Sequence, residues 1–315
     1  MKKLVYYIGI LVCISIFLSS CIAEDTSDCP VDGIVPQLVL VPYEGSIPAI
    51  INDSLFSAQV YVFDELDRFV TTYQIQGRPQ LNQTYTPNWI LPYGKYSYIA
   101  WVNDDAKSFK ADPCVAGQSI LNQTLLQLLV PQSKAIDNTG NIPFLCYGHL
   151  DNQELDSIGS NIITIPIMQF VNRINVTVTG MNYAPEPSDK YTIAITDNNG
   201  TYGFDGAFAS NDMFTYSTNG QDNGDNMVAS LKVLRLSGDR PNPVITINDS
   251  TTGEQLFSAN LTQLILASNP NNDFDKTHVY NIVIDNLFSS DKEIPITITI
   301  NDWIVDQSNN EFNIN

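Results

Sequence analysis

The first side chain that could undergo chemistry is Cys21, which ends the segment Leu18-Ser19-Ser20-Cys21. Lys2 and Lys3 precede an apolar run from Leu4 to Phe17, which is the order of a secretory signal peptide. This run of 14 residues is too short for a bilayer core, which needs roughly 20. An ordinary cleavage site would end in Ala-x-Ala, whereas Leu-Ser-Ser-Cys matches the bacterial lipobox, in which the cysteine thiol takes a diacylglyceryl group. We therefore predict a lipoprotein signal peptide over residues 1–20 and lipidation of Cys21, against the simpler interpretation of a cysteine near an ordinary cleavage site.

Cleavage before Cys21 would free its amine for a further acyl chain such as palmitate. Each buried methylene contributes about 0.8 kcal/mol, so one chain binds marginally and two or three anchor stably. No other apolar run approaches membrane length. The sequence thus predicts a chain that is attached to a membrane by lipid and does not span it.

Three further cysteines, Cys29, Cys114 and Cys146, would lie in an oxidising compartment, where one pair can form a disulfide. The spacing does not decide which pair forms. We favour Cys29 with Cys114, because Cys146 lies in the apolar stretch Pro-Phe-Leu-Cys-Tyr-Gly, where a buried inert thiol is common. No zinc spacing is present.

Acidic residues dominate the mature chain, with 34 Asp and Glu against 13 Lys and Arg once Lys2 and Lys3 are removed, a formal net charge of −21 instead of −19. Such a field repels phosphate groups, so nucleic-acid binding is excluded. The chain has no G-x-S-x-G elbow, phosphate-binding loop or dinucleotide fingerprint, and its two histidines, His149 and His278, fit no metal-ligand spacing. We interpret His149 as a loop residue and His278 as a structural one, and we expect no enzyme, metal or cofactor.

The elements that would carry these side chains are short strands with alternating apolar residues and turn-forming connectors. Alternation is clearest in the second half, for example in Ile174-Val176-Val178 and Tyr191-Ile193-Ile195. The same pattern or strand-rich composition predicts strands at residues 37–41, 58–63, 69–74, 96–103, 144–147, 162–167, 280–284 and 296–300. Only Ser119 to Val130 shows helical offsets, through Leu125, Leu126 and Leu129.

Many strands and little helix predict an all-β fold of antiparallel β-sandwiches with short helical insertions. The length fits two tandem sandwiches. After the signal peptide we expect a tether over residues 21–34, an N-terminal sandwich over 35–168, and a C-terminal sandwich over 169–315 that includes a terminal strand. A short, stiff junction should join the sandwiches.

Tryptophan could stack on sugars if it were exposed. Trp101 and Trp303 follow alternating strand residues, so we expect both to pack in a core. Trp89, in Thr86-Pro87-Asn88-Trp89, is the one we expect to be exposed.

Several passages resemble the anchor-type subunits of fimbrillin, or type V, pili of Gram-negative bacteria, the FimB-like family. They are the lipobox with the acidic segment from Cys21 to Cys29, then Tyr98-Ile99-Ala100-Trp101, Asn172-Arg173-Ile174-Asn175-Val176 and Ile298-Thr299-Ile300-Asn301-Asp302-Trp303. The resemblance implies two transthyretin-like sandwiches, no catalysis, and an outer-membrane location facing outward. Glu24, Asp25 and Asp28 are similar to the acidic signal for surface export.

In this family, stalk subunits lose their first strand to a trypsin-like protease, and a neighbour's terminal strand fills the groove. Between Cys21 and Asp67 this chain has no Lys or Arg, so the first basic site is Arg68. The first strand, Gln37 to Val41, should stay in place, which suits an anchor that ends assembly at the membrane.

We expect the C-terminal segment, about Ile296 to Asn315, to donate a strand to a fimbrial stalk subunit through Ile296, Ile298, Ile300 and Trp303. Stalk and tip roles stay open, as does a different class, a glycan-binding surface lipoprotein of a polysaccharide-uptake system. Aromatic residues grouped on one exposed face would favour the glycan-binding class.

Overall fold

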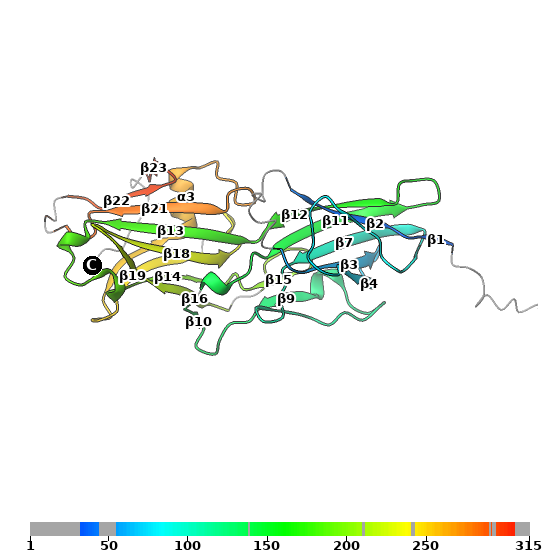
Figure 1. Ribbon diagram of the computed structural model, residues 1–315, viewed down its shortest axis with the longest axis horizontal. Coiled ribbons are helices and arrows are strands. Elements are labelled where there is room, and N and C mark those ends of the chain that lie inside the picture. The colour runs from blue at the N-terminus through cyan, green and yellow to red at the C-terminus, as the bar shows by residue number, and fades with distance from the viewer. Residues whose placement is uncertain are drawn as a thin grey trace, which may run out of the picture.

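The structure is a computed structural model that describes residues 32–43, 55–137, 139–209, 212–240, 243–289, 291 and 294–305. Its described part is all-β, as the sequence predicts, and forms an elongated body of two lobes (Figure 1). Cys21, Cys29, the acidic residues between them and the last residues of the proposed donor segment lie outside the described residues.

The first lobe is built on a seven-stranded sheet in the order β4-β3-β7-β11-β12-β2-β5. Its strands are β2 (Gln37–Pro42), β3 (Ala58–Asp64), β4 (Phe69–Gln74), β5 (Thr84–Tyr85), β7 (Gly94–Val102), β11 (Cys146–Leu155) and β12 (Ile162–Gln169). Beside it, β1 (Gly33–Ile34) pairs with β6 (Leu91–Pro92). All neighbours in the large sheet are antiparallel except β2 and β12, which run parallel.

Period-two alternation gives this sheet two apolar faces. Leu38, Leu40, Val60 and Tyr98 belong to one core, which the segment after β4 helps to cover through Ile75 and Leu91. The neighbouring residues in these strands point to the opposite face of the sheet, and those side chains, such as Tyr61, Ile99 and Trp101, belong to a second core. A sheet that is apolar on both faces requires a covering layer on each side.

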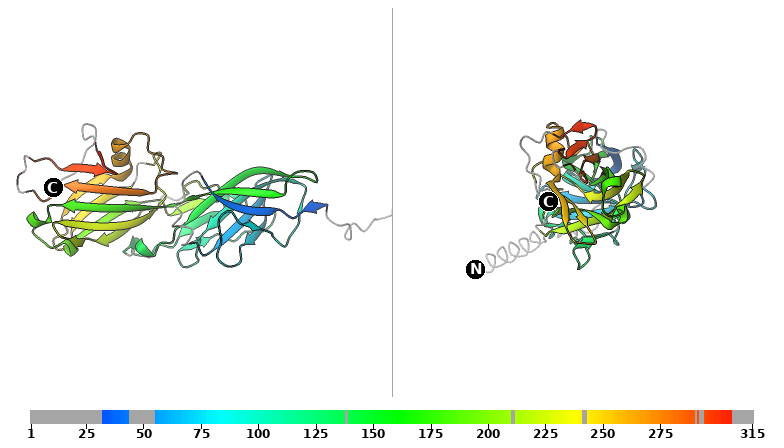
Figure 2. Two further views of the ribbon diagram at one scale, coloured as in Figure 1. Left: turned by 45° about the horizontal axis from the view of Figure 1, so that its top comes forward. Right: turned by 90° about the vertical axis from the view of Figure 1, so that its left-hand side faces the viewer.

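The second lobe is a sandwich of two sheets, seen from a second direction in Figure 2. The six-stranded sheet contains, in order, β17 (Gln221–Asn223), β18 (Asn226–Leu234), β13 (Val171–Thr179), β21 (Val279–Asp285), β22 (Thr297–Ile300) and β23 (Trp303–Ile304). The five-stranded sheet contains β10 (Ala135–Ile136), β16 (Phe214–Asn219), β14 (Tyr191–Asp197), β19 (Val244–Asp249) and β20 (Gln255–Asn260). Because β13 pairs parallel with β21, and β10 with β16, the sheets are mixed and not antiparallel throughout.

Helical structure is sparse. The one α-helix among the described residues, α3 (Leu261–Ser268), joins β20 to β21, and the Asn260 side chain caps it by accepting a hydrogen bond from the Gln263 amide. The remaining helical pieces are 3₁₀ turns: η2 (Leu121–Gln123), η3 (Thr139–Asn141), η4 (Met181–Tyr183) and η5 (Ser188–Lys190).

The helix predicted over Ser119–Val130 is wrong. That stretch forms η2 and then β9 (Leu125–Leu128), which buries Leu126 and Leu128 by strand alternation. β9 pairs with β8 (Phe109–Ala111) on one side and with β15 (Thr201–Gly203) on the other. The apolar face of the seven-stranded sheet, which needed a cover, explains why a leucine-rich segment prefers to be a strand here.

The lobes are tied together by more than their covalent link. β15 and β16 come after residue 200, yet they pair with β9 and β10, which precede β11. β12 ends at Gln169 and β13 begins at Val171, so the chain passes between the large sheets through Phe170. The domain boundary between residues 168 and 169 stays a prediction. The second core contains residues from both sides of this boundary.

Candidate functional site

The first long strand, β2, lies inside the seven-stranded sheet. All six of its residues pair with β12, from Gln37 opposite Ile162 to Pro42 opposite Ile167. On its other side β5 covers Leu38 and Val39, and the Asn82 amide donates to the Leu40 carbonyl at 2.8 Å. Leu38 and Leu40 are fully buried. Removal of β2 would therefore open an apolar groove beside β12.

Arg68, the first basic residue after Cys21, lies in the turn between β3 and β4. Its guanidinium binds the Asp64 carboxylate, with Nη2 at 2.8 Å and Nε at 2.9 Å from Oδ2. The Arg68 amide also donates to Asp64 Oδ1, and these hydrogen bonds hold the pKa of that carboxyl below its usual value, against the opposing effect of burial. A cut here would fall downstream of β2 and β3 and would separate β3 from β4.

The described part of the proposed donor segment contains both buried and exposed side chains. β22 pairs with β21, and Ile298 and Ile300 are buried in the second core, with Ile296 packed partly against it. Donation of these residues to another subunit would require β22 to leave its own sheet. Beyond them, β23 returns along β22 after a two-residue turn at Asn301 and Asp302, both with positive φ, 48° and 68°.

The outermost strand β23 leaves two large apolar side chains in solvent, Trp303 at 66% and Ile304 at 72% exposure. Trp303 lies next to a small hollow of about 120 Å³ lined by the end of α3, Tyr280 and Ile300. The expectation that Trp303 packs in the core is wrong, because the tight turn places it opposite Ile300 but at the open edge of the sheet.

The other tryptophans also differ in their surroundings. Trp101 is fully buried, as expected, and its ring lies 4.8 Å from that of Tyr147 and 5.8 Å from that of Phe170. Trp89 is half-buried, and its Nε1 donates to the Thr72 carbonyl at 3.3 Å. Trp303, and not Trp89, is therefore the most exposed of the three.

The cysteines in the described part are not bonded to each other. Cys146 is fully buried, and burial raises the pKa of its thiol to about 12, which fits the inert thiol expected from its apolar surroundings. Cys114 is partly buried, and burial raises its thiol pKa to about 11. The proposed pairing of Cys114 with Cys29 remains a prediction, since Cys29 is outside the described residues.

Both histidines have structural surroundings. His278 is buried, its Nδ1 lies 3.3 Å from Asn172 Oδ1, and burial lowers its pKa. His149 lies in β11 and not in a loop, with Nε2 at 2.6 Å from Asp151 Oδ1. In the part of the chain that the structure describes, no three His, Cys, Asp or Glu side chains come together as a metal site.

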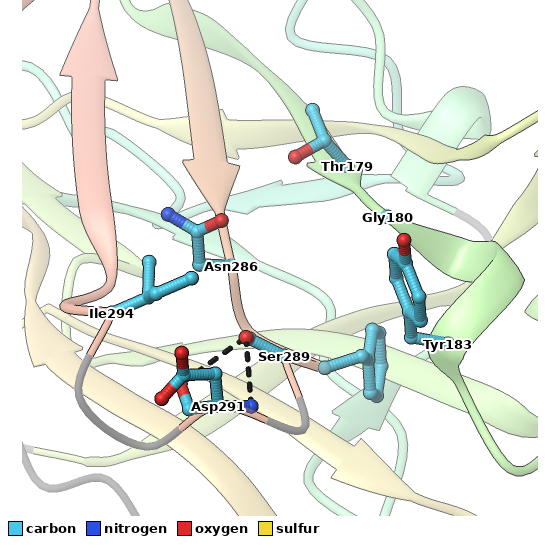
Figure 3. A pocket seen from close by; sticks show the side chains of 8 residues that line it. Thr179, Gly180, Tyr183, Asn286, Ser289, Asp291 and Ile294 are labelled. Atoms are coloured by element: carbon cyan, nitrogen blue, oxygen red, sulfur yellow. Dashed lines mark hydrogen bonds between the residues drawn. The ribbon is translucent and has the colours of Figure 1, made fainter.

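A further hollow, of about 330 Å³, lies at the end of the second lobe, where β13 and β21 finish (Figure 3). Tyr183 and Ile294 line it, and the loop after β21 contributes Ser289, whose hydroxyl donates to the Asp291 carbonyl. Tyr183 is 67% exposed. In Figure 1 this end of β13 is opposite the end that carries β1.

Within the described residues, no helix has the length and apolar character needed to cross a membrane.

Comparison with known proteins gives a consistent result. The family model described as fimbrillin-A associated anchor proteins Mfa1 and Mfa2 matches residues 27–309. The minor fimbrium anchoring subunit Mfa2 of Porphyromonas gingivalis is 26% identical over 265 residues, which covers 78% of this chain and 77% of that protein.

Solved structures show the same fold. The fimbrial anchor protein Mfa2 from P. gingivalis aligns with a TM-score of 0.70 and 21% identity, over 86% of this chain and 98% of that one. A structure from Bacteroides thetaiotaomicron described as putative polysaccharide binding proteins aligns with a TM-score of 0.71 and 18% identity, over 88% and 99%.

Proposed function

This chain belongs to the family of fimbrillin-A associated anchor proteins Mfa1 and Mfa2, and from that premise we propose that it anchors a fimbria to the outer membrane through lipid on Cys21 and ends polymerisation there. The family consists of structural fimbrial proteins and not of enzymes, and it is associated with the cell surface. The lipobox supplies the attachment, and the acidic residues Glu24, Asp25 and Asp28 support an outward-facing position.

The observation that carries the terminating role is the placement of β2. A stalk subunit must lose its first strand to accept a neighbour, but here β2 is buried beside β12 and no Lys or Arg lies between Cys21 and Arg68. A trypsin-like protease therefore has no site at which to release β2 alone. With β2 in place, the groove beside β12 stays filled and cannot accept a further donor strand.

The partner is a fimbrial stalk subunit, which we place against the second lobe. Ile298 and Ile300 stabilise this protein's own sandwich, so the segment available without unfolding begins at Trp303. Among the described residues, β23 is the outermost strand of its sheet, and its outer edge, with Trp303 and Ile304 exposed, suits the addition of a strand or an aromatic contact from the partner. Residues 306–315 would extend this contact.

A glycan-binding lipoprotein would be expected to group its exposed aromatic side chains. Here Tyr93 follows β6 near β1, whereas Tyr43 and Phe56 lie at the other end of the seven-stranded sheet, next to strands β2 and β3, which β12, β11 and β7 separate. Tyr183 lies in η4, beyond the end of β13, and Trp303 lies on the edge strand β23. This separation favours the fimbrial role over glycan binding.

Replacement of Cys21 by alanine in the source bacterium tests the proposal. We expect fimbriae to be assembled but released into the medium, as measured by the fraction of fimbrial protein that sediments with cells. Complementation with the unchanged gene is the matched control. Fimbriae that stay on the cell surface when the Cys21→Ala chain is present and folded would contradict the anchoring role.

A further inference from the structure

Four large apolar side chains are exposed at the end of the first lobe that carries β1. Ile158 is 94% exposed, and Ile90, Tyr93 and Ile162 are between 44% and 56% exposed. We call these four residues the apolar rim. Single exposed apolar residues are normal on protein surfaces, but a group of them at one end indicates an interaction.

Strand pairing places the rim around the point where the chain enters the fold. β1 pairs with β6, with Ile34 opposite Leu91, so Ile90 and Tyr93 flank this pair. Gly94 lies opposite Leu155, which brings Tyr93 next to the β11–β12 hairpin that presents Ile158. The Asn161 side chain donates to the Val35 carbonyl at 3.0 Å, which ties the same hairpin to the residue that follows β1.

The local structure of the β11–β12 hairpin holds Ile158 outward. The Asp156 carboxylate accepts hydrogen bonds from the Ile158 amide at 2.8 Å and from the Gly159 amide, and these bonds lower the pKa of Asp156. A side-chain acceptor at this position forms an Asx turn, which fixes the loop without any contribution from the Ile158 side chain. Ile158 therefore contributes little to the fold that holds it.

The length of the tether limits the distance between this end of the molecule and the membrane. Asp32 lies eleven positions after Cys21, and a fully extended chain of eleven residue steps spans at most about 40 Å. A lipid on Cys21 thus keeps the β1 end of the molecule within that distance of the bilayer. Figures 1 and 2 show that β1 and the β11–β12 hairpin form this end, whereas the end of β13 lies at the other.

We propose that the apolar rim touches the lipid surface of the leaflet that holds Cys21, as a second contact that orients the molecule upright. Isoleucine side chains enter the acyl boundary and tyrosine prefers the interface, so Ile158 forms the deepest contact and Tyr93 a shallower one. At the same end Glu154 lies opposite Lys95, and Asp156 adds a further negative charge, so these three groups give no net attraction to anionic headgroups and the contact is apolar. This inference depends on the lipidation in the proposed function.

The test places the photo-crosslinking residue p-benzoylphenylalanine at position 158, 93 or 183 of the full chain in cells of the source bacterium. After irradiation, the purified protein is analysed by mass spectrometry for lipid adducts. We expect lipid adducts at positions 158 and 93 and none above background at position 183, which is 67% exposed, between the values of the other two, but lies in η4 beyond the end of β13.

Two outcomes would overturn the inference while leaving the proposed function intact: no lipid adduct at position 158, or adducts with protein instead of lipid, in chains that are shown by labelled palmitate to be acylated at Cys21. Loss of acylation and of membrane sedimentation in the unsubstituted chain would instead contradict the proposed function, and the inference with it. Equal thermal unfolding temperatures of the three variants would confirm that each is folded.

Discussion

The guanidinium of Arg235 lies over the ring of Phe170, with its central carbon 5.1 Å from the ring centroid. Phe170 is the residue through which the chain passes from β12 to β13. Its ring also contacts those of Tyr147 and Tyr202, at centroid distances of 4.9 and 5.1 Å. The junction of the two lobes is therefore an aromatic core and not a flexible linker.

We predict that this core makes the lobes unfold together. Phe170→Ala should lower the free energy of unfolding by about 3–5 kcal/mol, because it removes a buried ring from between the two sheets. Calorimetry of the unsubstituted mature chain should show a single transition. Tyr93→Ala, at an exposed site, is the matched control with an expected change within about 0.5 kcal/mol. Two well-separated transitions in the unsubstituted protein would contradict the continuous core.

Asp104 and Asp197 should stabilise the fold as the pH falls from 8 toward 5, whereas His278, whose pKa burial lowers, has the opposite effect in this window. Burial raises the carboxyl pKa values of Asp104 and Asp197 to about 6, above their values in the unfolded chain. The folded state therefore binds more protons in this window, and each group contributes about 1.4 kcal/mol between pH 8 and 5 by the relation of 1.36 kcal/mol per pKa unit, since about one unit separates its pKa from pH 5. Urea unfolding at several pH values measures this effect.

Replacement of both buried carboxyl groups by amides is the control for that pH dependence. The double variant Asp104→Asn, Asp197→Asn should show a flatter profile between pH 5 and 8 than the parent. Asp64, whose pKa is lowered, loses stabilising interactions only as the pH falls through its depressed pKa, outside this window. A double variant whose stability changes between pH 8 and 5 as the parent's does would show that these carboxyls are not buried as described.

The C-terminal hairpin should separate stability from partner binding. Ile300→Ala should destabilise the protein by about 2–5 kcal/mol, since Ile300 is buried in the second core. Trp303→Ala should leave the unfolding free energy nearly unchanged and weaken capture of fimbrial subunits from membrane extracts. If a folded Trp303→Ala protein captured fimbrial subunits as well as the parent does, the proposed partner contact at β23 would be contradicted.

β2 should resist removal by trypsin. Digestion of the native mature chain should leave β2 attached, because no Lys or Arg lies between Cys21 and Arg68 and because Arg68 is bound to Asp64 in a tight turn. N-terminal sequencing and intact mass measure this, with the urea-denatured chain, cut after Arg68, as the positive control. A stable native core that starts at Phe69 would contradict the retained first strand.

Much of this fold could be predicted from the sequence, because alternating apolar residues mark half-buried strands directly, as in Ile174-Val176-Val178 of β13. Parallel pairing of β2 with β12 could not be predicted, since it joins residues more than 100 positions apart and leaves no local signal. In β9, three closely spaced leucines also fit helical offsets. The segment forms a strand because it covers an apolar face of the seven-stranded sheet, which the local sequence does not reveal.

Other features carry local signals in the sequence. Asn260 followed by Gln263, with apolar residues at helical spacing, marks the start of α3. Asn301-Asp302 between apolar residues marks the tight turn that exposes Trp303. The apolar rim had no such signal, because exposure of Ile158 depends on how two distant turns meet beside β1.

The central claim, that this chain holds a fimbria at the membrane, is tested most directly by what it binds there. The full chain, tagged after Asn315, would be purified from solubilised membranes and its bound proteins identified by N-terminal sequencing. A parallel preparation from Cys21→Ala cells controls for capture in solution. Our account predicts fimbrial subunits in the membrane preparation, whereas recovery of an outer-membrane sugar transporter without fimbrial subunits would contradict it.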